Sequence, residues 1–544
     1  MKIKFWLILI LFLAASLRLW NVSNNPPGLT WDEVALGYNA YSIMLTGRDE
    51  YGTLLPLNLK SFGDYKPSFY AYLDIPFIAV FGLTELAIRL PSAIIGILTV
   101  FVVFLLVQQL FKNQLLSLLS AFFVAVSPLA IQFSRPAFES NLAVFLNILG
   151  VYFFLKGLKQ KKWIFLSVIL FAFSSITYQA SRVFVPLLVL ALVVICKKDI
   201  DKKVIVTALT LFFALFSAVM LATILPGQTN RLSTLNYFAY QRSEEVINTI
   251  TIEDGFSKYD FGFQILHGEW WAYIKGLVER YLIYFSPKVL IIDGDYSQRH
   301  RVPDLGSMYY FSVVLLPLGF IFLLRQKGNA SKLLLVWLLL APIPAVLSRD
   351  LINMLRAFNM VIPLEVLQAG GVMFLIERLK GKRILLKLVL VLLSTTFLVN
   401  FSIYIDRYFI HAPKEYSKYW LYGYKQVIKS LGEKSKQYDK IVFTDSFGQP
   451  YIYYLFYSKY PPQRFQNQAH LEQNSADIGT IRRIDNIEFR HVDWPADRGV
   501  KNSLFIGTLE ELPDKDVKPF SEFTILKDIN FLDGQSAFRI VETR

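Results

Sequence analysis

The stretch that decides the fold runs from Ser92 to Phe111 and reads SAIIGILTVFVVFLLVQQLF. It contains no Asp, Glu, Lys or Arg, and a helix of that length is about 30 Å long, which matches the hydrocarbon core of a bilayer. The run therefore predicts a membrane-spanning helix. The rest of the chain has the same character, because 54% of its 544 residues are hydrophobic and 15% are aromatic, more than a protein packed in water contains.

Apolar runs that are candidates for spans recur along the chain. There are eleven, over residues 5–20, 92–111, 115–133, 140–156, 163–178, 183–196, 204–225, 307–324, 333–348, 356–376 and 384–405. With the N-terminus inside, the predicted inner segments carry nineteen Lys or Arg and the short outer loops carry four. This is the positive-inside pattern, so we expect a plasma membrane protein with a cytoplasmic N-terminus and an extracytoplasmic C-terminus. We expect span 5–20 to be retained, because Leu17-Arg18-Leu19-Trp20 is too bulky for a signal-peptide cleavage site.

Composition excludes several classes of protein. The net charge of +14 comes from short clusters between apolar runs rather than from one basic face, so we expect no nucleic-acid partner. The single cysteine, Cys196, excludes a disulfide framework and a cysteine metal site. We find no P-loop, Rossmann fingerprint, HExxH or GxSxG motif, which argues against nucleotide-driven and serine-hydrolase chemistry.

The chain divides into two predicted parts. Residues 1–405 form the membrane part, with outer loops at 21–90 and 226–306, and residues 406–544 form an extracytoplasmic α/β domain. The tail has β-like runs at 440–444, 503–507 and 537–541, with a predicted helix over 450–458 between the first two. Strand, turn, helix and strand in this order are typical of α/β structure.

The first outer loop holds two adjacent acids. Thr30 is a good N-cap for a helix over 31–45, and Asp32 and Glu33 fall in its first turn, where carboxylates favour the helix dipole. We expect this amphipathic helix to lie along the membrane surface. Taken alone, the two acids fit this structural role as well as they fit catalysis.

Further charged residues lie at the outer ends of predicted spans. Lys66 follows where the first loop returns to the membrane and can pair with a lipid phosphate, although a snorkelling lysine is equally common there. Glu139 is an acid at membrane depth, where a functional role is the default expectation, although Arg135 four residues earlier can simply neutralise it. The outer basic residues fit either headgroup contacts or a phosphate-binding cavity: Arg135, Arg182, Lys288, Arg299, His300 and Arg356.

Acids and cations on one outer face fit the transfer of a group from a phosphate leaving group. A carboxylate deprotonates an acceptor hydroxyl, and the cations stabilise the charge that develops on the departing phosphate.

At these residues the sequence resembles the GT-C glycosyltransferases, and within that fold the protein O-mannosyltransferase and aminoarabinose transferase group. The matching features are Trp31-Asp32-Glu33, Tyr65-Lys66-Pro67, Phe81-Gly82, Arg89-Leu90-Pro91-Ser92, an acid in the second short outer loop, and Val442-Phe443-Thr444-Asp445-Ser446 in the tail. The resemblance implies a GT-C fold of about eleven transmembrane helices and an inverting transfer of a sugar from a polyprenyl-phosphate carrier, without a nucleotide.

The resemblance also implies roles for individual residues. Asp32 is the expected base or acceptor-positioning carboxylate, with Glu33 beside it, and Lys66 contacts the lipid phosphate. Glu139 matches a second acidic position, which in the aminoarabinose transferases is Asp, so this chain has one extra methylene there. The family is mixed on metals. Since the sequence has no strong ligand cluster, we expect neither a metal nor another cofactor.

Three matters stay open at this point. The acceptor, carrying a hydroxyl or a phosphate, can be a glycan, a lipid or a protein. One alternative function is a transporter or flippase for a lipid-linked glycan, which would require charged or broken helices near the bilayer midplane. Another is a non-catalytic membrane receptor, which gives no reason for acids and a lysine to gather in the first loop.

Overall fold

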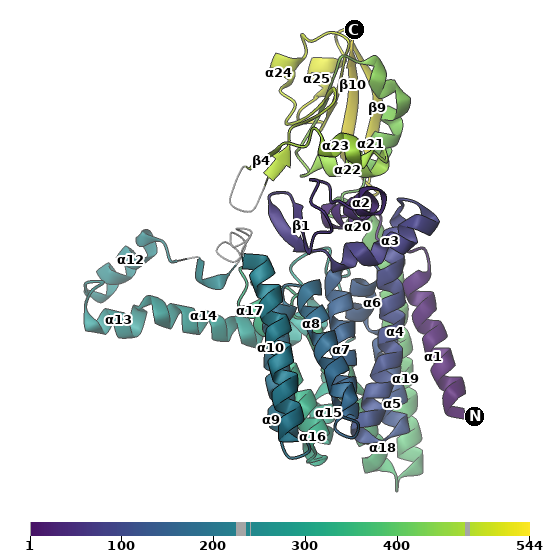
Figure 1. The fold of residues 1–544 in the computed structure, drawn as a ribbon, viewed down its shortest axis with the longest axis vertical. Helices are drawn as coiled ribbons and strands as arrows, with labels where there is room; N and C mark the ends of the chain where they lie inside the picture. The colour runs from purple at the N-terminus through teal and green to yellow at the C-terminus, as the bar shows by residue number, and fades with distance from the viewer. Residues whose placement is uncertain (1, 225–235, 240, 474–478) are drawn as a thin grey trace.

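A bundle of long helices carries a smaller α/β region at one end (Figure 1). The computed structural model describes residues 2–224, 236–239, 241–473 and 479–544. We call the end of the bundle beneath the α/β region the capped end. Predicted span 204–225 and predicted loop 226–306 each include residues that lie outside the described ones, within 225–235 and at 240.

A helix occupies each of the eleven predicted spans, and the chain is a multi-pass membrane protein. Among the described residues, six helices are long and apolar enough to cross a membrane, or seven if one bent pair counts as a span. Eleven crossings therefore stays a prediction. The bundle helices are α1 (Lys2–Leu19), α4 (Glu85–Phe111), α5 (Gln114–Val126), α6 (Pro128–Ser134), α7 (Glu139–Gly157), α8 (Lys162–Thr177), α9 (Ser181–Cys196), α10 (Lys202–Ile224), α15 (Ser312–Arg325), α16 (Asn329–Leu340), α17 (Ile343–Val346), η3 (Phe358–Met360), α18 (Val361–Leu379) and α19 (Arg383–Asp406).

The span predicted over 115–133 consists of two helices, α5 and α6, which meet at an angle of 57°. Pro128 lacks a backbone N–H and is the first residue of α6, with Ser127 as its N-cap, so the hydrogen-bond ladder of α5 is interrupted there. The carbonyls at the end of α5 bond instead to side chains. Arg18 donates to those of Val124 and Ala125 at 3.1 and 2.9 Å, and the Tyr309 hydroxyl donates to that of Val126 at 2.6 Å. Protein side chains therefore provide the hydrogen bonds that these carbonyl groups lose at the break.

The first loop folds into α2 (Trp31–Thr46), β1 (Asn58–Ser61), β2 (Asp64–Pro67) and α3 (Phe69–Phe81). The predicted helix is confirmed, but its apolar face packs against protein rather than against lipid. Leu36, Ala40 and Ile43 are buried, and Gly37 packs closely against Ile88 of α4 and Phe456 of the α/β region. Helix α2 is therefore enclosed between the bundle and the α/β region.

The second long loop contains helices that the sequence did not predict. Its elements are η1 (Tyr237–Ala239), α12 (Glu244–Asp254), α13 (Phe261–His267), α14 (Glu269–Ile283) and η2 (Lys288–Ile292). Figure 1 shows α12, α13 and α14 projecting sideways from the bundle near its capped end.

The α/β region is built on a six-stranded sheet in the order β6-β7-β3-β8-β10-β9, in which β7, β3 and β8 are parallel. The three predicted strands and the predicted helix α22 are confirmed. Short elements η4 (Arg407–His411) and α20 (Ala412–Glu415) lead into it. It contains α21 (Tyr424–Leu431), η5 (Gly432–Gln437), β3 (Lys440–Phe443), α22 (Pro450–Tyr457), α23 (Pro462–Gln466), β4 (Leu471–Gln473), β5 (Gly479–Ile481), β6 (Arg483–Ile484), β7 (Ile487–Phe489), α24 (Trp494–Asp497), β8 (Ser503–Gly507), α25 (Asp514–Val517), β9 (Phe523–Asn530) and β10 (Ser536–Thr543).

Candidate active site

The two acids at the start of α2 face in different directions. The Thr30 hydroxyl accepts a hydrogen bond from the backbone N–H of Glu33 at 3.3 Å, and the Glu33 carboxylate accepts one from the backbone N–H of Thr30 at 2.9 Å. This reciprocal cap fixes the first turn of the helix. The Glu33 side chain is 1% exposed, whereas that of Asp32 is 47% exposed. Glu33 therefore points into the protein, and Asp32 is accessible.

Glu33 forms a fully buried ion pair with Arg89 of α4. Nε of Arg89 lies 2.9 Å from Oε1 of Glu33, and the same oxygen accepts a hydrogen bond from the backbone N–H of Ala137 at 3.1 Å. The other guanidinium N–H groups donate to the backbone carbonyls of Val22, Pro26 and Gly28. This pair joins the segment before α2, helix α4 and the turn before α7.

A second buried arginine, Arg135, holds the same segment. Its guanidinium lies 5.5 and 5.0 Å from the ring centroids of Tyr408 and Phe409. It donates hydrogen bonds of 2.7–3.2 Å to the backbone carbonyls of Leu17, Arg18, Trp20 and Asn25. These contacts tie the end of α1 to the turn before α7, so Arg135 shapes the loop that leads to Asp32.

Lys66 reaches Asp32 from the β1–β2 hairpin. Its ammonium group forms an ion pair with the Asp32 carboxylate and lies 4.7 Å from the ring centroid of Phe62. Lys66 is only 8% exposed, so its charge interacts more strongly than it would in an exposed pair. The hairpin thus places a buried cation against the accessible acid.

The α/β region packs against Trp31 and the hairpin, next to this pair. Gly448 follows the end of β3 with φ of +96°, and a Cβ there would lie 2.6 Å from the indole of Trp31, so only glycine fits the approach. The amide of Gln449 donates to the carbonyl of Gly479 at 3.0 Å, and the backbone N–H of Gly479 donates to the carbonyl of Phe62 at 2.5 Å. The turn at 445–449, which lies where parallel strand β3 ends, therefore sits over Trp31 and the hairpin.

Arg299 reaches Trp31 from the second long loop, and His300 follows it in the chain. The Arg299 guanidinium lies 5.6 Å from the Trp31 ring centroid. Nδ1 of His300 lies 3.1 Å from Oδ2 of Asp295, and that oxygen accepts a hydrogen bond from the backbone N–H of Met354 at 2.6 Å. Asp295 therefore connects two loops and orients the histidine, whose ring lies 5.6 and 5.9 Å from those of Phe133 and Phe138.

Glu139 begins α7, two residues after Ala137, whose N–H binds Glu33, and it is partly buried. Asp74 of α3, which sequence reasoning missed, is fully buried, and neither carboxyl oxygen has a hydrogen-bond partner in the described structure. Its only sequence clue is one acid in the apolar run Phe69–Phe81.

Glu50 is a further buried acid that sequence reasoning missed. It accepts a hydrogen bond from the Asn39 amide at 3.1 Å, and burial raises the pKa of Glu50 to about 8.

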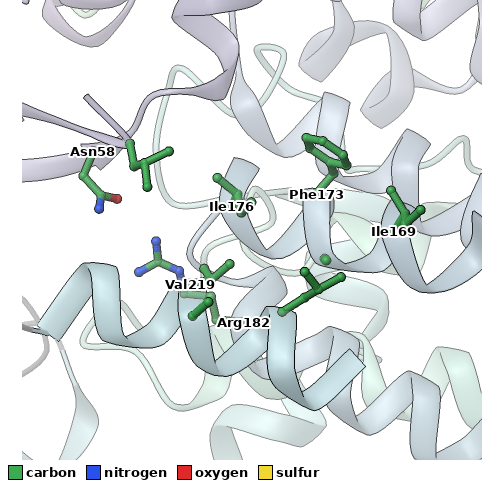
Figure 2. Close-up of a pocket in the computed structure, with 10 residues that line it drawn as sticks. Asn58, Ile169, Phe173, Ile176, Arg182 and Val219 are labelled. Atoms are coloured by element: carbon green, nitrogen blue, oxygen red, sulfur yellow. The ribbon is translucent and has the colours of Figure 1, made fainter. Parts of the chain in front are cut away.

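An apolar cavity of about 330 Å³ opens between α8, α9, α10 and β1. Figure 2 shows the Arg182 guanidinium and the Asn58 amide at one end, with Ile169 and Phe173 toward the other. In the β1–β2 register, Asn58 lies opposite Pro67, the residue after Lys66. The polar end of the cavity is therefore next to the hairpin that carries Lys66.

Two predicted cations pair with acids of their own loops. Nζ of Lys288 lies 3.7 Å from Asp293, and Nη1 of Arg356 lies 3.0 Å from Asp350. Among the described residues, no three His, Cys, Asp or Glu side chains form a group that could hold a metal ion.

Comparison with known proteins identifies the fold. A family model described as dolichyl-phosphate-mannose-protein mannosyltransferase matches residues 65–221, and no curated protein sequence matches the chain. ArnT from Cupriavidus metallidurans bound to undecaprenyl phosphate is similar with a TM-score of 0.54 and 11% identity, over 98% of this chain and 97% of that one. Archaeal oligosaccharyltransferase AglB from Archaeoglobus fulgidus, in complex with an inhibitory peptide and a dolichol-phosphate, is similar with a TM-score of 0.51 and 13% identity.

The similarity to AglB covers 84% of this chain but only 63% of AglB, so the chain spans less than two thirds of that enzyme's length. These likenesses show that the chain has the GT-C fold, as its first loop indicated. The family match includes Lys66, Glu139 and Arg182, whereas Asp32 and Glu33 precede it.

Proposed function

We propose that the protein is an inverting glycosyltransferase that moves a sugar from a polyprenyl-phosphate carrier to an acceptor hydroxyl or phosphate. The observation that carries this proposal is an accessible carboxylate, Asp32, paired with buried Lys66 beside an apolar cavity that has Arg182 at its polar end. The family match and the GT-C fold support the same chemistry. We place the site at the extracytoplasmic face of the plasma membrane. The proposed reaction requires neither a metal nor another cofactor.

For a hydroxyl acceptor, the reaction breaks the bond between the anomeric carbon and the phosphate oxygen, and forms a bond from the acceptor oxygen to that carbon. Asp32 takes the acceptor proton as general base. The leaving polyprenyl phosphate keeps the bonding electrons, and Lys66 and Arg182 stabilise its added charge. Glu33 and Arg89 act by holding the first turn of α2, while Glu139 faces the reacting sugar as a second acid.

The two ends of the cavity suit the two ends of the carrier. Apolar side chains of α8 and α10 fit isoprene units by van der Waals contact, and the guanidinium of Arg182 offers paired donors to phosphate. Lys66 serves as a compact second charge from the neighbouring hairpin. Arg299 and His300 complete the cationic side of the site.

The acceptor approaches from the side of the α/β region. The turn at 445–449 lies at the carboxyl end of a parallel strand, where α/β domains bind ligands, and it covers Trp31, the neighbour of Asp32. We therefore expect a polar acceptor, whether glycan, lipid or peptide, to contact this turn.

The α5–α6 break is the feature of the structure that most favours a flippase, because transporters have broken helices around their cargo. Its carbonyls are bonded to Arg18 and Tyr309, so the break is filled by protein rather than lining a path for cargo. We therefore favour group transfer.

Binding of undecaprenyl phosphate tests the donor site. Arg182→Gln removes a charge-assisted contact of about 1.5–3 kcal/mol, which corresponds to a roughly 10- to 150-fold rise in Kd. Ala218→Trp fills the cavity and should also weaken binding, whereas Val206→Trp, on the same helix and 62% exposed outside the cavity, should not. Unchanged binding by Ala218→Trp would show that the carrier lies elsewhere.

A further inference from the structure

Helix α14 carries an apolar stripe along its length. Trp270, Ile274, Val278 and Leu282 recur every fourth residue and are 75, 50, 51 and 60% exposed. Trp271 flanks the stripe and is also exposed. Residues four apart lie on one face of a helix, so α14 presents a continuous apolar face outside the protein core.

A different face of α14 fixes its orientation. The Tyr273 ring packs 5.8 and 5.4 Å from those of Tyr237 and Phe238. Arg280 lies 4.5 Å from the Tyr237 ring centroid and donates hydrogen bonds of 3.0–3.1 Å to the backbone carbonyls of Ser348, Arg349 and Asp350. These contacts prevent α14 from rolling, so its stripe cannot turn inward without breaking them.

The position of α14 indicates what covers its apolar stripe. Figure 1 shows α14 running across the direction of the bundle helices, near the capped ends of α10 and α17. A helix that leaves a membrane-spanning bundle sideways at this level runs along the bilayer surface. Its 15 residues extend about 22 Å over that surface, and tryptophan is enriched at this interface.

The charge of the segment shows how it would bind. Residues 241–283 carry seven Asp or Glu and four Lys or Arg, so an anionic headgroup surface does not attract them. Helix α13 also exposes apolar side chains, namely Phe261, Ile265 and Leu266. Binding therefore depends on apolar burial rather than on headgroup charge.

We infer that residues 241–283 form an interfacial arm, with the α14 stripe embedded among the lipids of the leaflet at the capped end. The arm broadens the base of the protein on that leaflet. This inference depends on the membrane location of the bundle and is independent of the proposed sugar transfer.

Site-directed spin labelling tests the arm in the full-length protein. The background is Cys196→Ala, which removes the single cysteine. One cysteine at a time is then placed at 270, 274, 275, 278, 279 or 282, labelled, and reconstituted in phosphatidylcholine vesicles. Val391→Cys on α19, 63% exposed, gives the lipid standard, and Lys518→Cys, in the α/β region, gives the aqueous one.

The inference predicts an alternating pattern of accessibility. Labels at 270, 274, 278 and 282 should collide with oxygen more than with a water-soluble nickel chelate, as the lipid standard does. The label at 279, on the side away from 270 and 274, should show the reverse, and the label at 275, which lies beside 282 at the edge of the stripe, should be intermediate. The pattern should be unchanged when a fifth of the lipid is phosphatidylglycerol.

Three results would overturn the inference. High nickel accessibility along the stripe would place the arm in water. Immobilised labels that neither reagent reaches would mean that protein, such as a second copy of the chain, covers the stripe. A pattern that appears only with phosphatidylglycerol would replace apolar burial with headgroup attraction.

Discussion

The buried ion pair between Glu33 and Arg89 leads to a prediction about the free energy of unfolding. Glu33 is buried whereas its neighbour Asp32 is accessible, so the same kind of substitution at the two positions can be compared. Glu33→Gln leaves the Arg89 guanidinium inside the protein without its counter-charge, and breaking a buried pair in this way costs about 3–5 kcal/mol. Asp32→Asn removes an acid that is 47% exposed, so water can replace part of its contact with Lys66, and the loss should lie between the roughly 1 kcal/mol of an exposed pair and the cost of breaking a buried one. Glu33→Gln should therefore lower the free energy of unfolding more than the neighbouring isosteric substitution Asp32→Asn.

Unfolding by sodium dodecyl sulfate in mixed micelles, followed by circular dichroism, measures this difference. Arg89→Met should cost at least as much as Glu33→Gln, since it also leaves the carbonyls of Val22, Pro26 and Gly28 without donors. The double variant should be less destabilised than the sum of the single variants, because the two groups form one pair. Equal destabilisation by Glu33→Gln and Asp32→Asn, or additive effects of Glu33→Gln and Arg89→Met, would refute the reasoning.

Three further predictions concern the donor, pH and topology. Lys66→Ala should raise the Kd for undecaprenyl phosphate more than about tenfold, since it removes a charged partner of phosphate; unchanged binding would reject this role. Burial raises the pKa of Glu50 to about 8 from 4.5, so the folded state retains a proton that the unfolded chain has released, and stability should fall as pH rises to about 8 and then level off. Glu50→Gln should flatten this slope in melting curves between pH 6 and 8.5, and an identical slope would contradict the assignment. A reporter that is active only in the cytoplasm, fused after Arg544, should be silent, and activity would invert the topology.

Local patterns predicted the bundle helices, helix α2 and three strands of the tail. The run 92–111 lies within α4, and the cap formed by Thr30 and Glu33 was visible from residues three apart. Residues distant in sequence decided what the patterns missed. The side chains that bond to the carbonyls at the α5–α6 bend, Arg18 and Tyr309, are far away in sequence, and the stripe on α2 fits a lipid surface as well as it fits the α/β region that covers it.

In the candidate site, too, residues distant in sequence decide what local patterns cannot predict. Adjacent acids such as Asp32 and Glu33 look equivalent in sequence, and only the partner Arg89, 56 residues away from Glu33, separates an accessible acid from a buried one. Arg135 was expected among the phosphate ligands, yet four backbone carbonyls bind its guanidinium. Asp74 and Glu50 escaped notice because tertiary packing, rather than spacing, brings them into the interior.

Sugar transfer by membranes that contain the wild type or Asp32→Asn, at matched expression and with labelled polyprenyl-phosphate sugars as donors, tests the central claim most directly. The account predicts transfer by the wild type and a loss of about 10²- to 10⁴-fold in the variant, which is the usual contribution of a general base. Transfer at the wild-type rate by Asp32→Asn would contradict the account and direct the search for the base to Glu139.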